Sequence, residues 1–488
     1  MKDEELLKLA YKAIKKSKKT VSNDYYALKY HLMPSVGFIN DPNGFINING
    51  EYHLFYQFNP LYPNGKKAYW GHVKSRDLVN WQELPIALCP SEWYETHGCY
   101  SGSAINYDGI FTLMYTGNVK DASGNRETYQ CIAQSEDGVN FSKYENNPVI
   151  YNQPQGYTRH FRDPKVWRYG DLWYMVIGTQ TVEEQGTALL YSSQDLFNWK
   201  MIGEIAGANI EELSSLGYMW ECPNLLNIDG EDVLIFCPQG VEEKGDLYNN
   251  RYQCGYLIGS LDYETGKLAY RNFIELDRGF EFYAPQVTKD SRGRKLLIGW
   301  MGLPDEEESP TVKNGWLHCL TIVRELSIKN DTIIQKPVEE MKLLRKNEIK
   351  YNDIQVRNNK VKFDEISGDS YELVCNFSWD IVSEFGIKLR CNKDCSEETL
   401  LYYDTENEKL VLDRDKSGLS LSGVRKCKIK NNGSLKLHIF IDTSSIEVFV
   451  NGGEEVFTSR IYPHKDSRDI IFYSKGGNVK FDIQYWQL

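Results

Sequence analysis

The sequence GEYHLFYQF, residues 50–58, is the first of five similar segments in this chain of 488 residues. It starts with glycine in a polar turn and continues with aliphatic and aromatic residues, which is typical of a β-strand. The later copies are GIFTLMYTG from Gly109, GDLWYMVIG from Gly170, GEDVLIFCP from Gly230 and GRKLLIGWM from Gly293. Successive copies start 59, 61, 60 and 63 residues apart. A period of this length suits a four-stranded propeller blade, so the spacing predicts a five-bladed β-propeller.

A second motif follows three of these segments and supports the same repeat. It reads SRDLVNW from Ser75, SEDGVNF from Ser135 and SQDLFNW from Ser193, and SLDYETG from Ser260 is a weaker version. The alternative fold, a β-sandwich whose hairpins are similar by coincidence, leaves the regular spacing of both motifs unexplained.

The repeat ends after Leu326, and a different pattern begins near Tyr351. Apolar and polar residues alternate there, and the turn at Asn451-Gly452-Gly453 favours a hairpin of an antiparallel β-sandwich. Residues 4–19 have the apolar spacing of an amphipathic helix. We therefore predict an all-β fold, a five-bladed β-propeller followed by a C-terminal antiparallel β-sandwich, with a short N-terminal helix. The expected boundaries are 1–29 for the helical segment, 30–330 for the propeller, 331–350 for a linker and 351–488 for the sandwich.

Charge and composition disfavour several classes of function. Lys and Arg total 56 and Asp and Glu total 68, and this net charge of -12 disfavours binding to nucleic acid or to an anionic membrane. No run of about 18 apolar residues indicates a membrane span, and residues 1–24 lack the apolar core of a signal peptide, so we expect a cytoplasmic protein. The 11 cysteines and 8 histidines show no zinc-type spacing. We expect neither a metal nor a cofactor.

Three acidic residues occupy similar places shortly before the repeated segments. Asp41 and Glu221 each lie nine residues before the glycine of their repeat, and Asp163 lies seven residues before its glycine. Blades two and five carry Ser101 and Tyr283 at this place. Since the blades of a propeller are equivalent, we expect the three carboxylates to meet at the mouth of the central channel.

Converging carboxylates suit the cleavage of a glycosidic bond, in which one acid attacks and the other donates a proton. The apolar neighbours of Glu221 in the sequence predict a raised pKa and the role of proton donor. Asn40 and Asn43 surround Asp41 with amide donors, which predicts that Asp41 stays ionised. The alternatives are acids that stabilise turns, as Asp41 before Pro-Asn-Gly would, or a calcium-binding cage.

Seven short motifs, in this order, resemble the invertase family, glycoside hydrolase family 32. They are NDPNG at 40–44, YQFNP at 56–60, WGH at 70–72, YSGSA at 100–104, RDP at 162–164, ECP at 221–223 and FYAPQ at 282–286. The resemblance covers nearly the whole chain and implies a five-bladed propeller with a C-terminal β-sandwich, in agreement with the repeats. The chain departs from the family at Phe38, where tryptophan is common, and at Glu281, where aspartate is common.

The resemblance also implies roles for individual residues. Asp41 is expected to be the nucleophile that forms a covalent fructosyl-enzyme, Glu221 the general acid and then the base, and Asp163 a group that stabilises the transition state. In a retaining enzyme the carboxyls of Asp41 and Glu221 would lie about 5–5.5 Å apart. The expected substrate contacts are Phe38, Asn40, Gln57, Trp70, Tyr100, Ser101, Arg162 and Tyr283.

Within the family, the chain most resembles bacterial sucrose-6-phosphate hydrolases and β-fructofuranosidases. Lys66 with Lys67, or Arg159 with His160, would bind a phosphate, or else these residues are solvated surface charges. The expected partner is a small sugar: sucrose 6-phosphate, sucrose or a short fructan. A fructosyltransferase shares all the motifs, whereas a non-catalytic sugar-binding propeller is expected to lack one of the carboxylates. We expect the sandwich to have a structural role or to form a homodimer.

Overall fold

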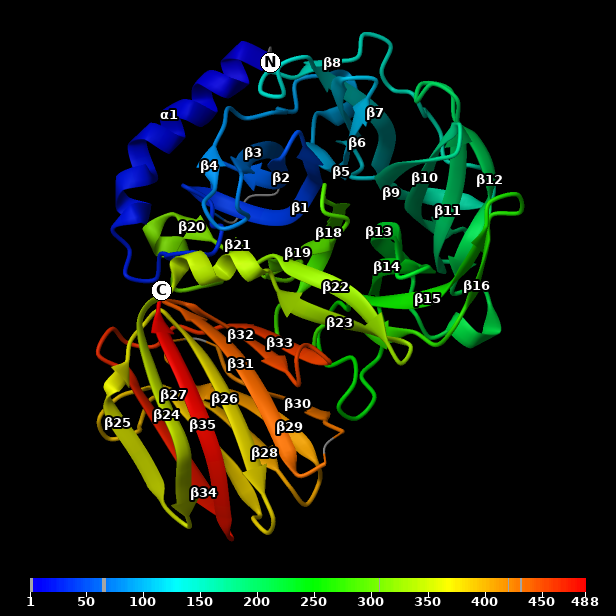
Figure 1. The fold of residues 1–488 in the computed structure, drawn as a ribbon. Coiled ribbons are helices and arrows are strands. Elements are labelled where there is room, and N and C mark those ends of the chain that lie inside the picture. The colour runs from blue at the N-terminus through cyan, green and yellow to red at the C-terminus, as the bar shows by residue number, and fades with distance from the viewer. Residues whose placement is uncertain (1–2, 64–66, 307, 420, 431) are drawn as a thin grey trace.

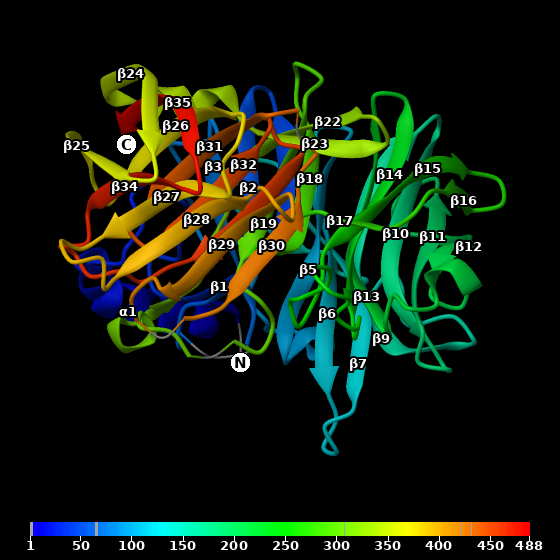
Figure 2. The same cartoon turned by 90° about the horizontal axis from the view of Figure 1, so that it is seen from below.

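The computed structural model describes residues 3–63, 67–306, 308–419, 421–430 and 432–488, and nearly all of its regular structure is β-strand (Figure 1). Five sheets form a propeller, and two further sheets form a sandwich beside it (Figure 2). The N-terminal helix α1 (Asp3–Ser22) packs Leu6 and Ala10 against Tyr69 and Cys89 of the first blade. The predicted fold class is therefore confirmed. Among the described residues, no helix combines the length and the apolar character that crossing a membrane requires.

Each blade contains four successively paired antiparallel strands, of which the first lies at the channel. Blade one contains β1 (Gly37–Ile48), β2 (Glu51–Asn59), β3 (Tyr69–Ser75) and β4 (Gln82–Glu83), with β20 (Trp316–Leu317) parallel to β1. Blade two contains β5 (Gly98–Tyr107), β6 (Ile110–Lys120), β7 (Arg126–Ser135) and β8 (Ser142–Lys143). Blade three contains β9 (Tyr157–Tyr169), β10 (Leu172–Thr181), β11 (Gly186–Ser193) and β12 (Lys200–Gly207).

The last two blades carry additional short strands. Blade four contains β13 (Met219–Ile228), β14 (Glu231–Gln239), β15 (Gly255–Asp262), β16 (Lys267–Tyr270) and β17 (Ile274–Glu275). Blade five contains β18 (Tyr283–Lys289), β19 (Lys295–Met301), β21 (Cys319–Leu320), β22 (Arg324–Lys329) and β23 (Thr332–Pro337). The repeated apolar segments of the sequence are the second strands β2, β6, β10, β14 and β19. The first strands β1, β5, β9, β13 and β18 contact one another in turn and close a ring.

The second sequence motif forms the same turn in three blades. Asp77, Asp137 and Asp195 each accept hydrogen bonds from the backbone N–H groups two and three residues later, and from the side-chain amide of an asparagine. Asp262 makes a similar turn, in which Thr265 donates in place of the asparagine. The shared turn supports the equivalence of the blades.

A β-bulge interrupts the first strand of each blade near the mouth of the channel. In β1, the segment from Ile39 to Pro42 lies opposite the shorter segment from Phe58 to Tyr56. The same irregularity occurs at Tyr100 in β5, after Glu221 in β13 and after Tyr283 in β18, and beside Arg162 in β9. A bulge accepts a proline and re-aims the neighbouring side chain. The acidic motifs thus lie within long strands, at bulges.

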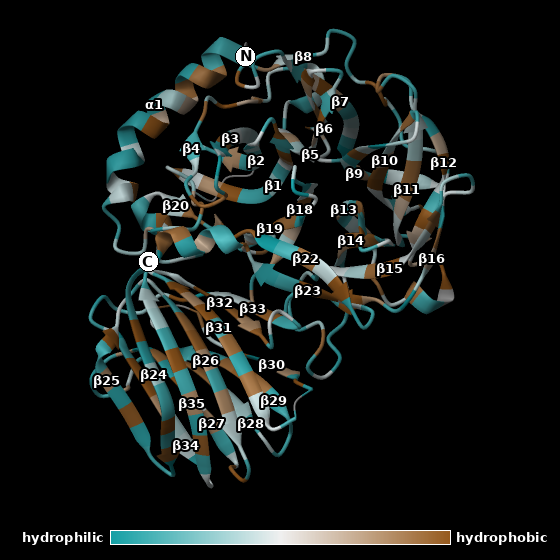
Figure 3. Cartoon of the chain, in the orientation of Figure 1, coloured by the Kyte–Doolittle hydropathy of each residue, from teal (hydrophilic) through white to brown (hydrophobic). Residues whose placement is uncertain are grey.

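The sandwich consists of two six-stranded antiparallel sheets, whose strands show alternating hydropathy (Figure 3). One contains β24 (Lys346–Arg357), β35 (Asn478–Gln487), β26 (Tyr371–Trp379), β31 (Ser434–Asp442), β32 (Ser445–Val450) and β33 (Glu455–Arg460). The other contains β25 (Lys360–Ser367), β34 (Asp469–Lys475), β27 (Glu384–Cys391), β28 (Glu398–Asp404), β29 (Lys409–Lys416) and β30 (Val424–Lys428). The segment 331–350, expected to be a linker, contains β23, the 3-10 helix η4 (Glu339–Leu344) and the start of β24.

Buried ion pairs join the sandwich to the propeller. The ring of His31 lies between Asp442 and Glu447, 3.0 Å from an oxygen of each. Arg324 of blade five also contacts Glu447, at 2.6 Å, and Asp277, at 3.0 Å. These charges are withdrawn from water, so their mutual contacts fix the relative position of the two domains.

Candidate active site

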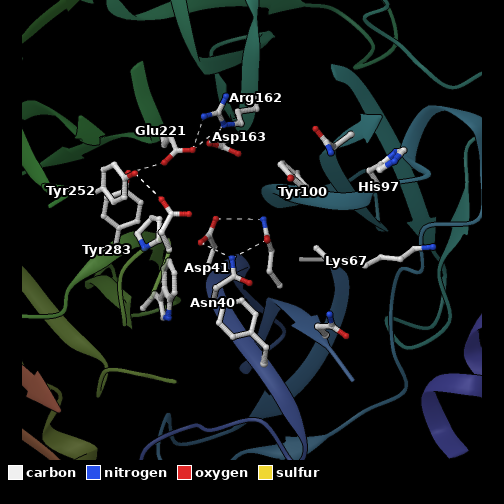
Figure 4. Close-up of a pocket in the computed structure, with 18 of the residues that line it drawn as sticks. Asn40, Asp41, Lys67, His97, Tyr100, Arg162, Asp163, Glu221, Tyr252 and Tyr283 are labelled. Atoms are coloured by element: carbon white, nitrogen blue, oxygen red, sulfur yellow. Dashed lines mark hydrogen bonds and ion pairs between the residues drawn. The ribbon is translucent and has the colours of Figure 1, made fainter. Parts of the chain in front are cut away.

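A cavity of about 550 Å³ opens at the centre of the ring of first strands. Asp41, Asp163 and Glu221 line it from β1, β9 and β13, and Figure 4 shows these side chains facing one another. The expected convergence of the three acids is therefore present in the geometry. A cavity of this size, with a few polar groups directed inward, is typical of a small-molecule site.

Asp41 is surrounded by polar donors. Asn40 Nδ2 donates to Oδ1 at 3.0 Å and Ser101 Oγ donates to Oδ2 at 2.5 Å. Gln57 Nε2 donates to Ser101 at 2.6 Å, so these side chains hold one another and the carboxylate in place. Burial nevertheless raises the pKa of Asp41 to about 7, with the negative charge of Asp163 as a further cause. The prediction that amide donors keep Asp41 ionised is wrong, because the donors do not offset desolvation and repulsion.

Glu221 has hydrogen-bond donors at both oxygens. Arg162 donates to Oε1 through Nε at 3.0 Å and Nη2 at 2.6 Å, while Gln239 and Tyr283 donate to Oε2 at 2.6 and 2.7 Å. Burial acts to raise the pKa of Glu221, but Arg162 outweighs burial and the pKa is lowered. The predicted raised pKa of Glu221 is therefore wrong. Successive side chains of a strand point to opposite faces, so Trp220 is in the core and does not form the surroundings of the Glu221 carboxylate.

Asp163 occupies a strained position at the bulge. Its φ of 67° lies in the left-handed region, and the backbone N–H of Cys222 donates to its Oδ2 at 3.0 Å. Arg162 Nε lies 3.9 Å from the same oxygen. Burial raises the pKa of Asp163 to about 6, and the charge of Glu221 adds to this, whereas Arg162 opposes it. The positive charge beside Asp163 and Glu221 is thus a guanidinium, which is unlike the all-oxygen surroundings of a calcium cage.

The three acids therefore take up a proton as the pH falls through about 7, and that proton is held most strongly at Asp41. The carboxylates share this proton as a cluster, and moving it from Asp41 to Glu221 leaves the net charge of the cluster unchanged. Such a cluster can supply both an anion and a proton donor, as glycosidic cleavage requires.

The predicted substrate contacts fall into two groups. Six of them line the cavity: Phe38, Asn40, Gln57, Tyr100, Arg162 and Tyr283. Trp70 and Ser101 lie behind it. The indole of Trp70 is fully buried and donates to the carbonyl of Tyr100 at 3.1 Å, and Ser101 supports Asp41.

The predicted phosphate contacts are also divided. Lys67 and His160 line the cavity, whereas Arg159 forms an ion pair with Glu127. Lys66 lies outside the described residues. Burial and the charge of Arg162 lower the pKa of His160 to about 4, so this ring is neutral at neutral pH.

Glu281, which departs from the family pattern, does not line the cavity. It is buried between the domains, where Arg414 Nη1 and the backbone N–H of Arg460 contact its two oxygens. Its longer side chain therefore serves domain contact.

Several cavity residues were not predicted from the sequence, among them Trp300, Tyr252 and Arg126. Asn59, Asn118 and Gln239 were not predicted either, although the sequence contains a signal for them. Each lies nine residues after the glycine of its repeat, at the same place in β2, β6 and β14. Comparing that place across the blades would have identified them.

Comparisons with known proteins agree with this architecture. The N-terminal domain of glycosyl hydrolases family 32 matches residues 31–337, and the C-terminal domain of the same family matches residues 340–487. A sucrose-6-phosphate hydrolase of Bacillus subtilis is 40% identical over 488 residues, which cover 100% of this chain and 99% of the relative. A sucrose-6-phosphate hydrolase of Salmonella typhimurium is 42% identical over a segment that covers 90% of this chain and 89% of the relative.

Solved structures of the family are similar along the whole chain. The sucrose-6-phosphate hydrolase of Lactobacillus gasseri has a TM-score of 0.88 at 33% identity, with 98% of this chain and 96% of that chain covered. A β-fructofuranosidase of Bombyx mori in complex with sucrose has a TM-score of 0.86 at 34% identity, with 100% and 99% covered. The chain therefore belongs to glycosyl hydrolase family 32.

Proposed function

We propose that this enzyme hydrolyses the β-fructofuranosidic bond of sucrose 6-phosphate and of sucrose, with retention of configuration. The observation that carries the proposal is the meeting of Asp41 and Glu221 in one buried cavity, each with its own set of donors. The names of the family relatives support the choice of sugar, because those from Bacillus subtilis and Lactobacillus gasseri are sucrose-6-phosphate hydrolases.

In the first step, Asp41 Oδ attacks the anomeric carbon of the fructosyl unit. The bond from that carbon to the bridging oxygen breaks, and Glu221 transfers its proton to this oxygen, so the glucosyl part leaves as an alcohol. Ser101 and Asn40 orient the attacking carboxylate through their hydrogen bonds. Asp163 stabilises the positive charge that develops on the fructosyl ring.

In the second step, a water molecule cleaves the covalent fructosyl-enzyme. Glu221, now a carboxylate, takes a proton from water as the water attacks the anomeric carbon, and Asp41 leaves as the free carboxylate. Arg162, Tyr283 and Gln239 suit this stage, since all three donate to an ionised Glu221. Two inversions at one carbon give overall retention.

Catalysis requires the proton to be on Glu221 and not on Asp41, although the protein groups around the two carboxyls favour the reverse. Both arrangements hold one proton, so pH does not change their ratio. A substrate that develops positive charge beside Asp41 favours its ionised form and thereby the productive arrangement.

The test is kcat/KM for sucrose and sucrose 6-phosphate measured side by side, with Asp41→Ala as the blank. We expect turnover of both sugars and none with the variant. NMR of the fructose released at early times should show the β-anomer first. Absence of turnover with both sugars would redirect the assignment to fructans and then to sugar binding without catalysis. A product with inverted configuration would contradict the covalent mechanism.

A further inference from the structure

One side of the cavity carries basic residues that have no acidic partner among the residues the structure describes. Lys67, Lys120 and Arg126 all line it, and in the described part of the chain no carboxylate lies within 4.0 Å of their charged nitrogens. His97 lines the same side, and Figure 4 shows Lys67 and His97 across the cavity from Tyr252 and Tyr283. For a chain with a net charge of -12, a group of unpaired cations facing a cavity calls for an anionic ligand.

Arg126 is the central residue of this group. It begins β7 and pairs across the hairpin with Lys120, the last residue of β6. Its guanidinium carbon lies 5.3 Å from the centre of the Tyr100 ring, which fixes its orientation. Nη1 is buried and has no hydrogen-bond partner among the residues described. By contrast, Arg159 on the neighbouring strand β9 is neutralised by Glu127.

His97 offers a further donor beside Lys120. Its Nδ1 accepts a hydrogen bond from the backbone N–H of Lys120 at 3.0 Å. With Nδ1 accepting this bond, Nε2 is the ring nitrogen that can donate to an anion.

The location of Arg126 relates this group to the leaving sugar. The positive charge of Arg126 interacts with Arg162, Glu221 and Asp163, and it also contributes to the lowered pKa of His160. The charge of Arg126 therefore reaches the Arg162–Glu221 pair, although Arg126 lies in blade two and Glu221 in blade four. Under the proposed function, on which this inference rests, Glu221 protonates the bridging oxygen, so the leaving sugar lies between Glu221 and the basic side of the cavity.

We infer that Arg126, with Lys120, His97 and Lys67, binds the phosphate group on the leaving glucosyl unit of sucrose 6-phosphate. A guanidinium donates two parallel hydrogen bonds to phosphate oxygens, and nearby ammonium groups add charge. The same residues would bind the phosphate of the product glucose 6-phosphate. Of the two basic pairs singled out in the sequence, Arg159–His160 contributes no free cation to this site.

The test compares the variant Arg126→Gln with the wild-type enzyme on both sugars. The measured quantity is the ratio of kcat/KM for sucrose 6-phosphate to kcat/KM for sucrose. We expect this ratio to fall by about 10- to 100-fold, because a charge-assisted contact to the phosphate is lost. Arg126→Lys should give a ratio between those of the wild type and Arg126→Gln, because lysine keeps the positive charge but cannot donate two parallel hydrogen bonds. Arg159→Gln is the matched control and should leave the ratio unchanged.

Product inhibition gives a second measurement on the same enzymes. Glucose 6-phosphate should inhibit wild-type sucrose hydrolysis at a concentration at least tenfold lower than glucose does, and Arg126→Gln should remove most of this difference. A ratio unchanged in Arg126→Gln, or an equal fall for both sugars, would overturn the phosphate site. Hydrolysis of sucrose with no preference for the phosphorylated sugar in the wild type would also overturn it while leaving the proposed function intact. Hydrolysis of neither sugar would contradict the proposed function itself.

Discussion

His31 provides a quantitative test of how the sandwich is held against the propeller. Its ring is fully buried and donates toward Asp442 and Glu447 from its two nitrogens. Burial acts to lower the pKa of His31, but hydrogen bonds and charge from the two carboxylates outweigh burial and raise the pKa to about 9. The histidine is therefore positively charged in the folded protein at neutral pH.

The size of the effect follows from linkage between protonation and folding. The rise from the ordinary pKa of 6.5 to about 9 corresponds to about 3 kcal/mol of stability. Since the pKa is higher in the folded state, this stability is fully present below pH 6.5. It is lost as the pH rises through about 9, where the folded protein gives up the proton.

The perturbation is His31→Gln, which keeps a polar side chain but never carries the charge. Urea denaturation of wild type and variant at pH 6 and pH 10 gives the difference in the free energy of unfolding at each pH. We expect the wild type to be more stable at pH 6, and its advantage to shrink by about 3 kcal/mol at pH 10. Other titrating groups, such as Lys165, occur in both proteins and cancel in the difference.

The matched control is His464→Gln. His464 also lies near a carboxylate, 3.5 Å from Asp466, but its side chain is 65% exposed. An exposed pair contributes little, so this variant should show the same small difference at both pH values. A difference for His31→Gln that does not change between pH 6 and pH 10 would refute the reasoning.

Four further predictions concern the cavity, the blade core and the blade turns. Glu221→Gln and Asp41→Asn should each lower kcat by several orders of magnitude without changing the thermal unfolding midpoint; a near wild-type rate in either would contradict the assigned roles. In the wild type, kcat/KM should fall as the pH rises above about 7, because the carboxylate cluster, in which the pKa of Asp41 is raised, then loses its last proton. A kcat/KM that stays constant up to pH 9 would show that catalysis does not need this proton. Lys165 donates to the carbonyl of Val287 at 2.6 Å and has no carboxylate partner among the described residues, and burial lowers its pKa to about 7. The free energy of unfolding of the wild type should therefore increase from pH 7 to pH 10 by about 4 kcal/mol relative to that of Lys165→Met. Parallel pH profiles of the two proteins would contradict a buried amine. Asp195→Ala should lower the free energy of unfolding, measured by urea denaturation, by about 1 kcal/mol, because four hydrogen bonds of one turn are lost. Asp171→Ala on the same blade should lower it by less, and equal losses for the two variants would contradict the role of the turn.

Much of the fold could be predicted because the chain repeats itself. The glycines at 50, 109, 170, 230 and 293 each precede the second strand of a blade, and the aspartates at 77, 137 and 195 form the turn between two later strands. Local composition and turn chemistry specify such elements, so a regular spacing is sufficient to count the blades. The same periodicity predicted that Asp41, Asp163 and Glu221 would meet.

The protonation of the site could not be predicted in this way. The residues adjacent to Glu221 in the sequence suggested an apolar environment, whereas Arg162 and Tyr283, 59 and 62 residues away, donate to its carboxylate. Asp41 has amide donors nearby in the sequence, yet burial and the charge of Asp163 raise its pKa. A pKa depends on the atoms within a few ångströms of the carboxyl, and these come from different blades.

The basic side of the cavity shows the same distinction between local and distant information. Lys67, His97, Lys120 and Arg126 form no motif in the sequence, and they meet because blades one and two are adjacent in the ring. Repeats and motifs in the chain were sufficient for the blade count, the sandwich, the family and the three acids, because each is indicated by a short motif or by a regular spacing along the chain. The tertiary structure decided which charges are paired, which acid holds the proton and which cations face the cavity. These properties depend on side chains that come together from distant blades, because electrostatic energy depends on distance in space and not on separation along the chain.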